Sequence, residues 1–144
     1  MEKKKVSITM ISRQHSQKGE PEDEINFFTI GEYYQDQGTH VINYEESQVS
    51  GLEGTTTTLK VKEDSVILER AGNYYMSQIF RVDQKEYTIY KTPYGEFLVE
   101  IVPTIVESNW TKEGGQINLL YCISVGGRHL GQHFMSINIA DVPN

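Results

Sequence analysis

The sequence predicts an all-β protein, and its composition, periodicity and turn spacing all point to that class. The chain of 144 residues contains 11 valines, 14 isoleucines and 11 threonines, against 2 alanines and 7 leucines. β-Branched side chains lose rotamer freedom in a helix and pack well on a pleated sheet. Residues 117–125 and 135–140 alternate with a period of two, which indicates strands with one buried face.

The first half of the chain divides into five strand segments separated by turn residues. We expect a first strand that begins with the apolar stretch 6–11 and ends at the turn at residues 18–21, and further strands over residues 27–35, 39–46, 55–61 and 66–70. Gly, Pro, Asp and Ser cluster at residues 18–21, 36–38 and 62–65, where they favour the backbone angles of turns. Residues 47–53 are the one stretch in which we expect a possible helical turn.

The second half repeats this pattern of short strands and short turns. We expect strands over residues 74–82, 86–92, 96–106 and 116–125, and a last strand after Gly126 and Gly127. The turns fall at residues 71–73, 83–85, 93–95 and 112–115. Trp110 lies between polar residues outside these strands, so we expect it in a loop, either as a packing residue or as a partner-contact or lid residue.

Short connections between successive strands favour an antiparallel meander. About eight to ten twisted strands with little helix either close into a barrel or stack as two sheets. Closure removes exposed edges, and a barrel of this size holds side chains or one small ligand. We therefore favour a closed or nearly closed barrel over a sandwich, although periodicity alone does not separate the two.

Length and charge narrow the class further. Residues 1–144 suit a single domain, and the net charge of −7 argues against binding to nucleic acid or to an anionic membrane. Cys122 is the only cysteine, which excludes an internal disulfide. The apolar stretch 6–11 is too short and polar for a signal peptide, and no run approaches the ~20 residues of a membrane-spanning helix. We expect a cytoplasmic location.

Strand parity places several polar side chains on the inward face of the barrel. An ionised group there costs several kcal/mol unless it is paired, so Glu46 and Arg70 are expected to form a hydrogen-bonded pair. The tyrosines are expected mainly to pack, with some at the mouth of a pocket. The candidate ligand-binding residues are Tyr44, Glu46, Thr57, Arg70, Tyr94, Tyr121 and His133.

Two interpretations of these residues remain open. They could form a structural polar network near the barrel mouth. They could instead line a pocket in which Arg70 holds an anionic or carbonyl group while Glu46 or His133 holds a donor. The sequence has no motif for a serine hydrolase, a nucleotide site or a zinc protease, so we assign no catalytic residue, metal or cofactor. His129 and His133, four apart on a strand, are too far apart for one metal unless a bulge intervenes.

Ordered short motifs carry a resemblance to a known family. They are Gly31 with Tyr33 and Tyr34, Tyr44 with Glu46, Thr57 with Leu59, Arg70 with Gly72, residues 93–95, Ile117 with Tyr121, and His133 with Met135 and Ile137. By their order and spacing from Val6 to Ile139 the chain resembles the YwiB-like bacterial proteins, a family of unknown function. The resemblance implies a calycin-like (lipocalin-type) β-barrel and no activity. The loop over residues 49–54 is longer than in that family, which concerns only the barrel rim.

Three functions therefore compete. The first is a non-enzymatic barrel that binds a small hydrophobic or amphipathic ligand. The second is an enzyme with Glu46 and His133 as an acid–base pair in the lumen. The third is an interaction module with a barrel filled by side chains, acting as a homodimer. The first predicts an internal cavity that is connected to solvent and thermal stabilisation by a ligand. The second predicts Glu46 and His133 within hydrogen-bond reach in an open cleft. The third predicts a filled barrel and an exposed apolar patch.

Overall fold

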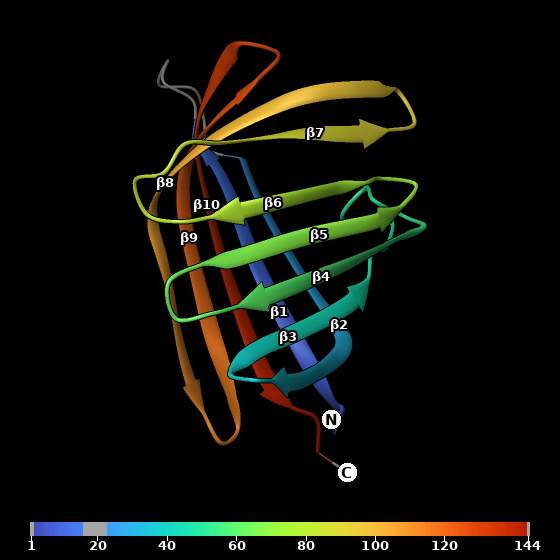
Figure 1. The fold of residues 1–144 in the computed structure, drawn as a ribbon. Helices are drawn as coiled ribbons and strands as arrows, with labels where there is room; N and C mark the ends of the chain where they lie inside the picture. The colour runs from blue at the N-terminus through green and yellow to red at the C-terminus, as the bar shows by residue number, and fades with distance from the viewer. Residues whose placement is uncertain (1, 16–22, 144) are drawn as a thin grey trace.

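The computed structural model describes residues 2–15 and 23–143, which form one antiparallel sheet of ten strands (Figure 1). The strands are β1 (Lys4–His15), β2 (Asp23–Asp36), β3 (Thr39–Glu45), β4 (Thr55–Val61), β5 (Val66–Gly72), β6 (Met76–Phe80), β7 (Glu86–Thr92), β8 (Gly95–Thr111), β9 (Gly114–Val125) and β10 (Arg128–Asp141). No helix occurs in the described ranges, so none there is long and apolar enough to cross a membrane. The turn predicted at residues 18–21 lies outside the described residues.

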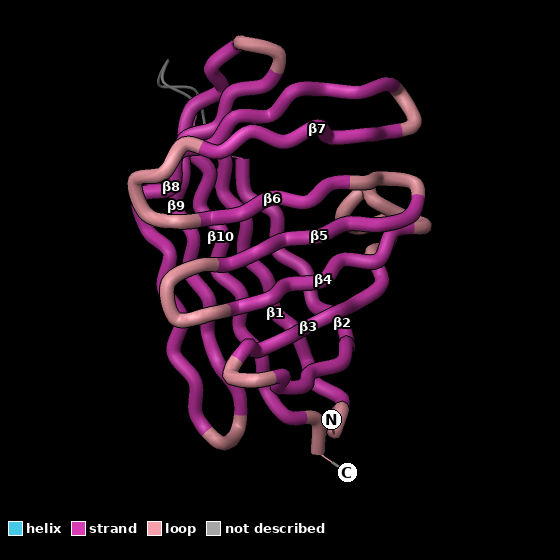
Figure 2. The backbone as a smooth tube through the Cα atoms, viewed as in Figure 1, coloured by secondary structure: helices cyan, strands magenta, loops and turns pink. Residues whose placement is uncertain are grey.

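The sheet is a meander that curls until its two ends nearly meet. Its order is β6-β5-β4-β3-β2-β1-β10-β9-β8-β7, so β1 pairs with β10 and the two edges are β6 and β7. These edges lie side by side (Figure 2) and are joined where Tyr75 and Lys91 exchange two backbone hydrogen bonds of 2.9 Å. The predicted all-β barrel is confirmed as a nearly closed one, with a seam between β6 and β7.

The observed strand boundaries agree best with the predicted ones where Gly, Pro, Asp or Ser residues mark the turns. β4 and β7 match the predicted ranges 55–61 and 86–92. Residues 47–53 form turns and no helix, so the predicted helical turn is wrong. The loop predicted around Trp110 is also wrong, because β8 continues to Thr111 through a bulge between Pro103 and Ile105. A bulge absorbs an extra residue without ending the strand.

Alternate residues point into the barrel as the parity predicted. Thr55, Thr57, Leu59 and Val61 of β4 are all fully buried. In the half of the barrel nearer the termini, the inward side chains pack closely and leave only a space of about 20 Å³. The fully buried members of this packed half include Val6, Ile8, Ile42, Leu59, Val61, Ile117, Leu119 and Ile137.

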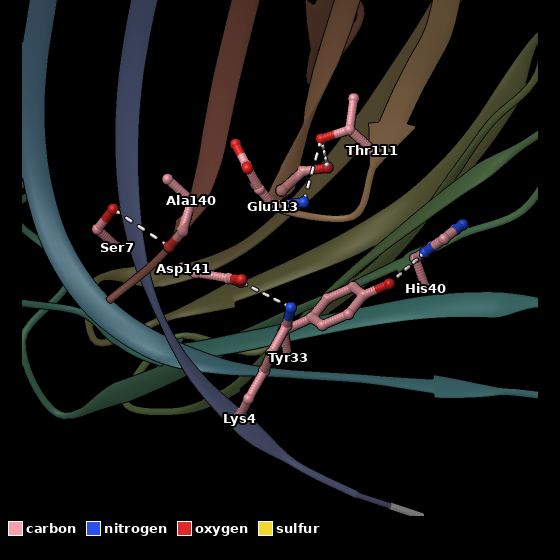
Figure 3. A network of polar contacts seen from close by, with 9 residues as sticks. Lys4, Ser7, Tyr33, His40, Thr111, Glu113, Ala140 and Asp141 are labelled. Atoms are coloured by element: carbon pink, nitrogen blue, oxygen red, sulfur yellow. Dashed lines mark hydrogen bonds and ion pairs between the residues drawn. The ribbon is translucent and has the colours of Figure 1, made fainter. Parts of the chain in front are cut away.

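The end that carries the termini is closed by aromatic and charged side chains (Figure 3). The Tyr33 hydroxyl lies 2.6 Å from His40 Nδ1, and the Trp110 ring stacks on His40 with centroids 3.9 Å apart. Lys4 and Asp141 form an ion pair of 2.6 Å that links the first and last strands. We call Tyr33, His40 and Trp110 the aromatic plug.

Candidate functional site

The other half of the barrel contains a cavity of about 270 Å³. Its walls are mainly apolar and come from nine of the ten strands, all except β4. Ile25 lines it and is also 48 % exposed, which places an opening between β2 and the loop after β3. Side chains from that loop, Ser50 and Leu52, complete this rim. The interior is thus filled at the end near the termini and hollow toward the opposite end.

Five of the seven candidate residues line this cavity. They are Tyr44, Glu46, Arg70, Tyr121 and His133. Thr57 is fully buried beside them, and its hydroxyl donates a hydrogen bond of 2.5 Å to Glu46 Oε2. Tyr94 lies apart from the cavity in the turn between β7 and β8, where it is 85 % exposed. This turn forms the free end of the β7–β8 hairpin (Figure 1), so Tyr94 does not belong to the inward face of either strand.

The predicted pair between Glu46 and Arg70 is wrong. No ion pair or hydrogen bond joins them within the described chain, although both line the cavity. Arg70 Nη1 instead donates to the Tyr90 hydroxyl at 3.3 Å, and the guanidinium carbon lies 5.8 Å from that ring's centroid. Because Arg70 is on β5 and Tyr90 on β7, this contact bridges the seam from the inside. The hydrogen-bond partner of Glu46 is therefore Thr57 and not Arg70.

His133 is held in one tautomer by its neighbours. Its Nδ1 lies 2.9 Å from Gln14 Oε1, and its Nε2 lies 2.7 Å from Ser12 Oγ. An amide oxygen only accepts, so Nδ1 carries the proton and Nε2 accepts the serine hydroxyl. The imidazole also stacks on Tyr121, with centroids 5.2 Å apart. Burial, and secondarily the positive charge of Arg70, lower the pKa of His133, so the ring is neutral.

The buried tyrosines are uncharged hydrogen-bonding groups. Burial raises the pKa of Tyr121 to about 12 against the opposing effect of Arg70. Burial and the negative charge of Glu46 raise the pKa of Tyr44 well above its usual range. The lumen therefore carries one positive and one negative side chain, Arg70 and Glu46, among neutral groups.

Four polar residues of the cavity were missed in the candidate set: Ser12, Ser50, Gln78 and Tyr90. Gln78 is 2 % exposed and lines the cavity between Met76 and Phe80 on the inward face of β6. Even spacing from those two apolar residues is the signal that could have found it. Ser12 was missed because no inward face was assigned to the first strand. Tyr90 was missed because no sequence pattern fixes the register across the seam.

We expect the free energy of unfolding to fall as the pH drops below the ordinary pKa of histidine, with His133 responsible for part of the loss. Its folded-state pKa lies below the ordinary 6.5. Between the folded-state pKa and 6.5 the unfolded chain binds more protons than the folded chain does. The stability that is present above about pH 6.5 is therefore lost as the pH falls through the folded-state pKa. The pKa of His40 is also lowered by burial, which acts in the same direction.

Urea denaturation at several pH values measures this effect. His133→Gln should flatten the pH dependence relative to that of the wild type, and His129→Gln, at an exposed position of the same strand, is the control variant. A His133→Gln profile parallel to that of the wild type would contradict the assignment.

Comparison with known proteins gives the same fold. The model of a family described as a domain of unknown function (DUF1934) matches residues 8–137. The uncharacterized beta-barrel protein YwiB of Bacillus subtilis is 27 % identical over 135 residues, covering 94 % of each chain. The crystal structure of the ywiB protein from Bacillus subtilis superposes with a TM-score of 0.85 at 25 % identity, over 98 % of this chain and 94 % of that one. These matches confirm the resemblance seen in the sequence motifs, and the chain belongs to the DUF1934 family.

Proposed function

We propose that the protein binds one small, mainly apolar ligand in the barrel cavity and is not an enzyme. The cavity itself is the observation that carries this proposal. Native interiors rarely leave voids larger than a water molecule, whose share of liquid volume is about 30 Å³. A space of about 270 Å³ with mainly apolar walls is close to the lower limit of small-molecule sites.

The energetics of packing support the same proposal. A cavity lined by apolar side chains lowers stability in proportion to its volume, and the other half of this barrel shows that the fold can be filled. A hollow half is therefore a cost that ligand binding would offset. Calycin-like (lipocalin-type) barrels also hold one ligand in a lumen closed at one end, which supports the proposal by analogy of fold alone. We place the protein in the cytoplasm as part of this proposal.

The two competing functions fit the geometry less well. An acid–base mechanism would need Glu46 and His133 to act together, but in the described chain the carboxylate bonds Thr57 while the imidazole bonds Gln14 and Ser12. An interaction module with a filled barrel has no use for a hollow half. We therefore retain ligand binding as the proposed function.

Filling the cavity should abolish binding. Ile123 lines the cavity from β9, and Ile123→Trp adds an indole where the ligand would lie. We expect the affinity for a neutral apolar fluorophore, N-phenylnaphthylamine, to fall at least about tenfold, equivalent to ~1.4 kcal/mol. The measurement is a fluorescence titration with direct excitation of the fluorophore.

The matched control is Ile105→Trp, because Ile105 is 37 % exposed and does not line the cavity. This variant should bind like the wild type, and thermal melts establish that both variants fold. A wild type that does not bind the fluorophore, or an Ile123→Trp variant that binds it equally well, would sink the proposal.

A further inference from the structure

Unpartnered polar atoms are concentrated in the cavity. Four buried side-chain atoms in the described part of the chain have no hydrogen-bond partner, and three of them belong to residues that line it. These three are Glu46 Oε1, Arg70 Nε and Gln78 Oε1; the fourth, Trp110 Nε1, is in the aromatic plug. Each buried unsatisfied group costs about 1–3 kcal/mol, so such atoms are rare in native interiors. Their occurrence on one cavity points to a polar group of a ligand.

The strand register places these three residues on one wall. Arg70 pairs with Thr57 on one side and with Met76 on the other. Gln78 follows Met76 by two residues, so it is a diagonal neighbour of Arg70 on the inward face, at roughly 7–8 Å between backbone positions, within reach of long side chains. The Glu46 carboxylate is fixed by Thr57, one strand away from Arg70. We call Glu46, Arg70 and Gln78 the polar wall.

The contacts already made define what the polar wall still offers. Thr57 occupies one carboxylate oxygen of Glu46, which leaves Oε1 as an acceptor. Tyr90 occupies Nη1 of Arg70, which leaves the Nε hydrogen as a donor. Gln78 donates through Nε2 to the Ile79 carbonyl oxygen at 3.3 Å, which leaves its own Oε1 as an acceptor. The buried wall atoms that lack any hydrogen-bond partner are therefore one donor and two acceptors.

Charge restricts the ligand further. Glu46 and Arg70 carry opposite charges on one wall of the cavity. Among the described residues, no other carboxylate, lysine or arginine lines it; its remaining titratable residues are Tyr44, Tyr90, Tyr121 and His133. A carboxylate head group bound by Arg70 would lie close to the Glu46 carboxylate, and an ammonium bound by Glu46 would lie close to the guanidinium. Like charges in a low-dielectric site repel by several kcal/mol. An uncharged head group avoids both costs.

We propose that the polar wall binds the primary carboxamide head group of a small amphiphile, whose apolar tail lies in the rest of the cavity. The carbonyl oxygen accepts from Arg70 Nε, and the two N–H groups donate to Glu46 Oε1 and Gln78 Oε1. A primary amide has the matching set of one carbonyl acceptor and two N–H donors. This inference rests on the proposed function and specifies its ligand class.

The test compares three ligands with the same tail, octanamide, octanoate and octylammonium, by isothermal titration calorimetry at pH 7.5. Octanamide should bind at least about tenfold more tightly than either ion, because each ion meets a like charge on the polar wall. Arg70→Met and Glu46→Gln should each weaken octanamide binding by about the same factor.

The two variants should also change the affinities for the two ions in opposite ways. A merely structural role of Glu46 and Arg70 would not produce this result. Glu46→Gln removes the repulsion of octanoate, so octanoate binding should strengthen. Arg70→Met removes the repulsion of octylammonium, so octylammonium binding should strengthen. The matched control is Glu45→Gln, because Glu45 makes the same kind of contact with Thr56, at 2.8 Å, on the exposed face. It should change none of the three affinities.

The outcomes separate this inference from the proposed function. Equal binding of all three ligands, with no effect of Arg70→Met or Glu46→Gln, would overturn the carboxamide assignment and leave ligand binding intact. Tightest binding of octanoate would overturn it in favour of an anion site at Arg70. Failure of all three ligands and of N-phenylnaphthylamine to bind would overturn both proposals.

Discussion

Replacement of Trp110 by alanine should lower the free energy of unfolding by about 3 kcal/mol. The indole lies parallel to the His40 ring, at an interplanar angle of 6°, and its centroid is 5.6 Å from that of Tyr33. Gly115 opposite Trp110 leaves room for the ring, since a Cβ at that position would lie 2.3 Å from Trp110 Cε3. The alanine variant would lose these contacts and open the end of the barrel at which Tyr33 and His40 lie (Figure 3).

Trp110→Phe is the matched control, and chemical denaturation in urea is the measurement. A phenyl ring keeps most of the stacking and removes the unpartnered buried indole N–H, so we expect a loss of about 1 kcal/mol or less. If alanine and phenylalanine cost the same, the ring does not close the barrel end as described. The ion pair of Lys4 and Asp141 would not compensate, because its side chains are 42 % and 44 % exposed and such pairs contribute little.

Local features of the fold were predictable because they depend on short-range physics. The alternation of Thr55, Thr57, Leu59 and Val61 fixes which face of β4 is buried, and the structure confirms it. The turn residues fix where β4 and β7 begin and end. Neighbouring strands in a meander need only short connections, so the antiparallel pairing followed from the loop lengths.

Features that depend on contacts between distant strands were not predictable. Arg70 and Tyr90 meet because the sheet curls until β6 and β7 are adjacent, and nothing in residues 66–92 specifies that geometry. The assumption that two opposite charges on one face must pair was wrong for a physical reason. Thr57 and Tyr90 were already within reach and satisfied one group of each ion.

How completely the side chains fill the barrel could not be predicted from the sequence either. Inward residues of both halves are mostly apolar, yet one half is filled and the other is hollow. Packing depends on how side chains of different size meet across the lumen, and period-two alternation says only that they face inward. The same limit explains Trp110, whose partner His40 lies 70 positions earlier in the chain.

Phe80→Ala should have a second large effect, and of a kind that links stability to ligand binding. Phe80 is 2 % exposed at the seam edge, lines the cavity and packs edge-on against Tyr121 with centroids 4.9 Å apart. Truncation of a buried phenylalanine costs about 3–5 kcal/mol, and the lost volume joins an existing cavity whose walls are held by the barrel. We expect a loss of about 4 kcal/mol in the free energy of unfolding, measured by urea denaturation.

The same truncation enlarges the proposed ligand site, so affinity should change in the opposite direction to stability. N-phenylnaphthylamine should bind Phe80→Ala more tightly than the wild type, and saturating fluorophore should restore part of the lost stability by mass action. Phe80→Leu is the control, because it retains most of the apolar volume and should lose only about 1–2 kcal/mol with little gain in affinity. A Phe80→Ala variant that is destabilised but binds no better, and is not stabilised by the fluorophore, would show that the cavity is a packing defect and not a binding site.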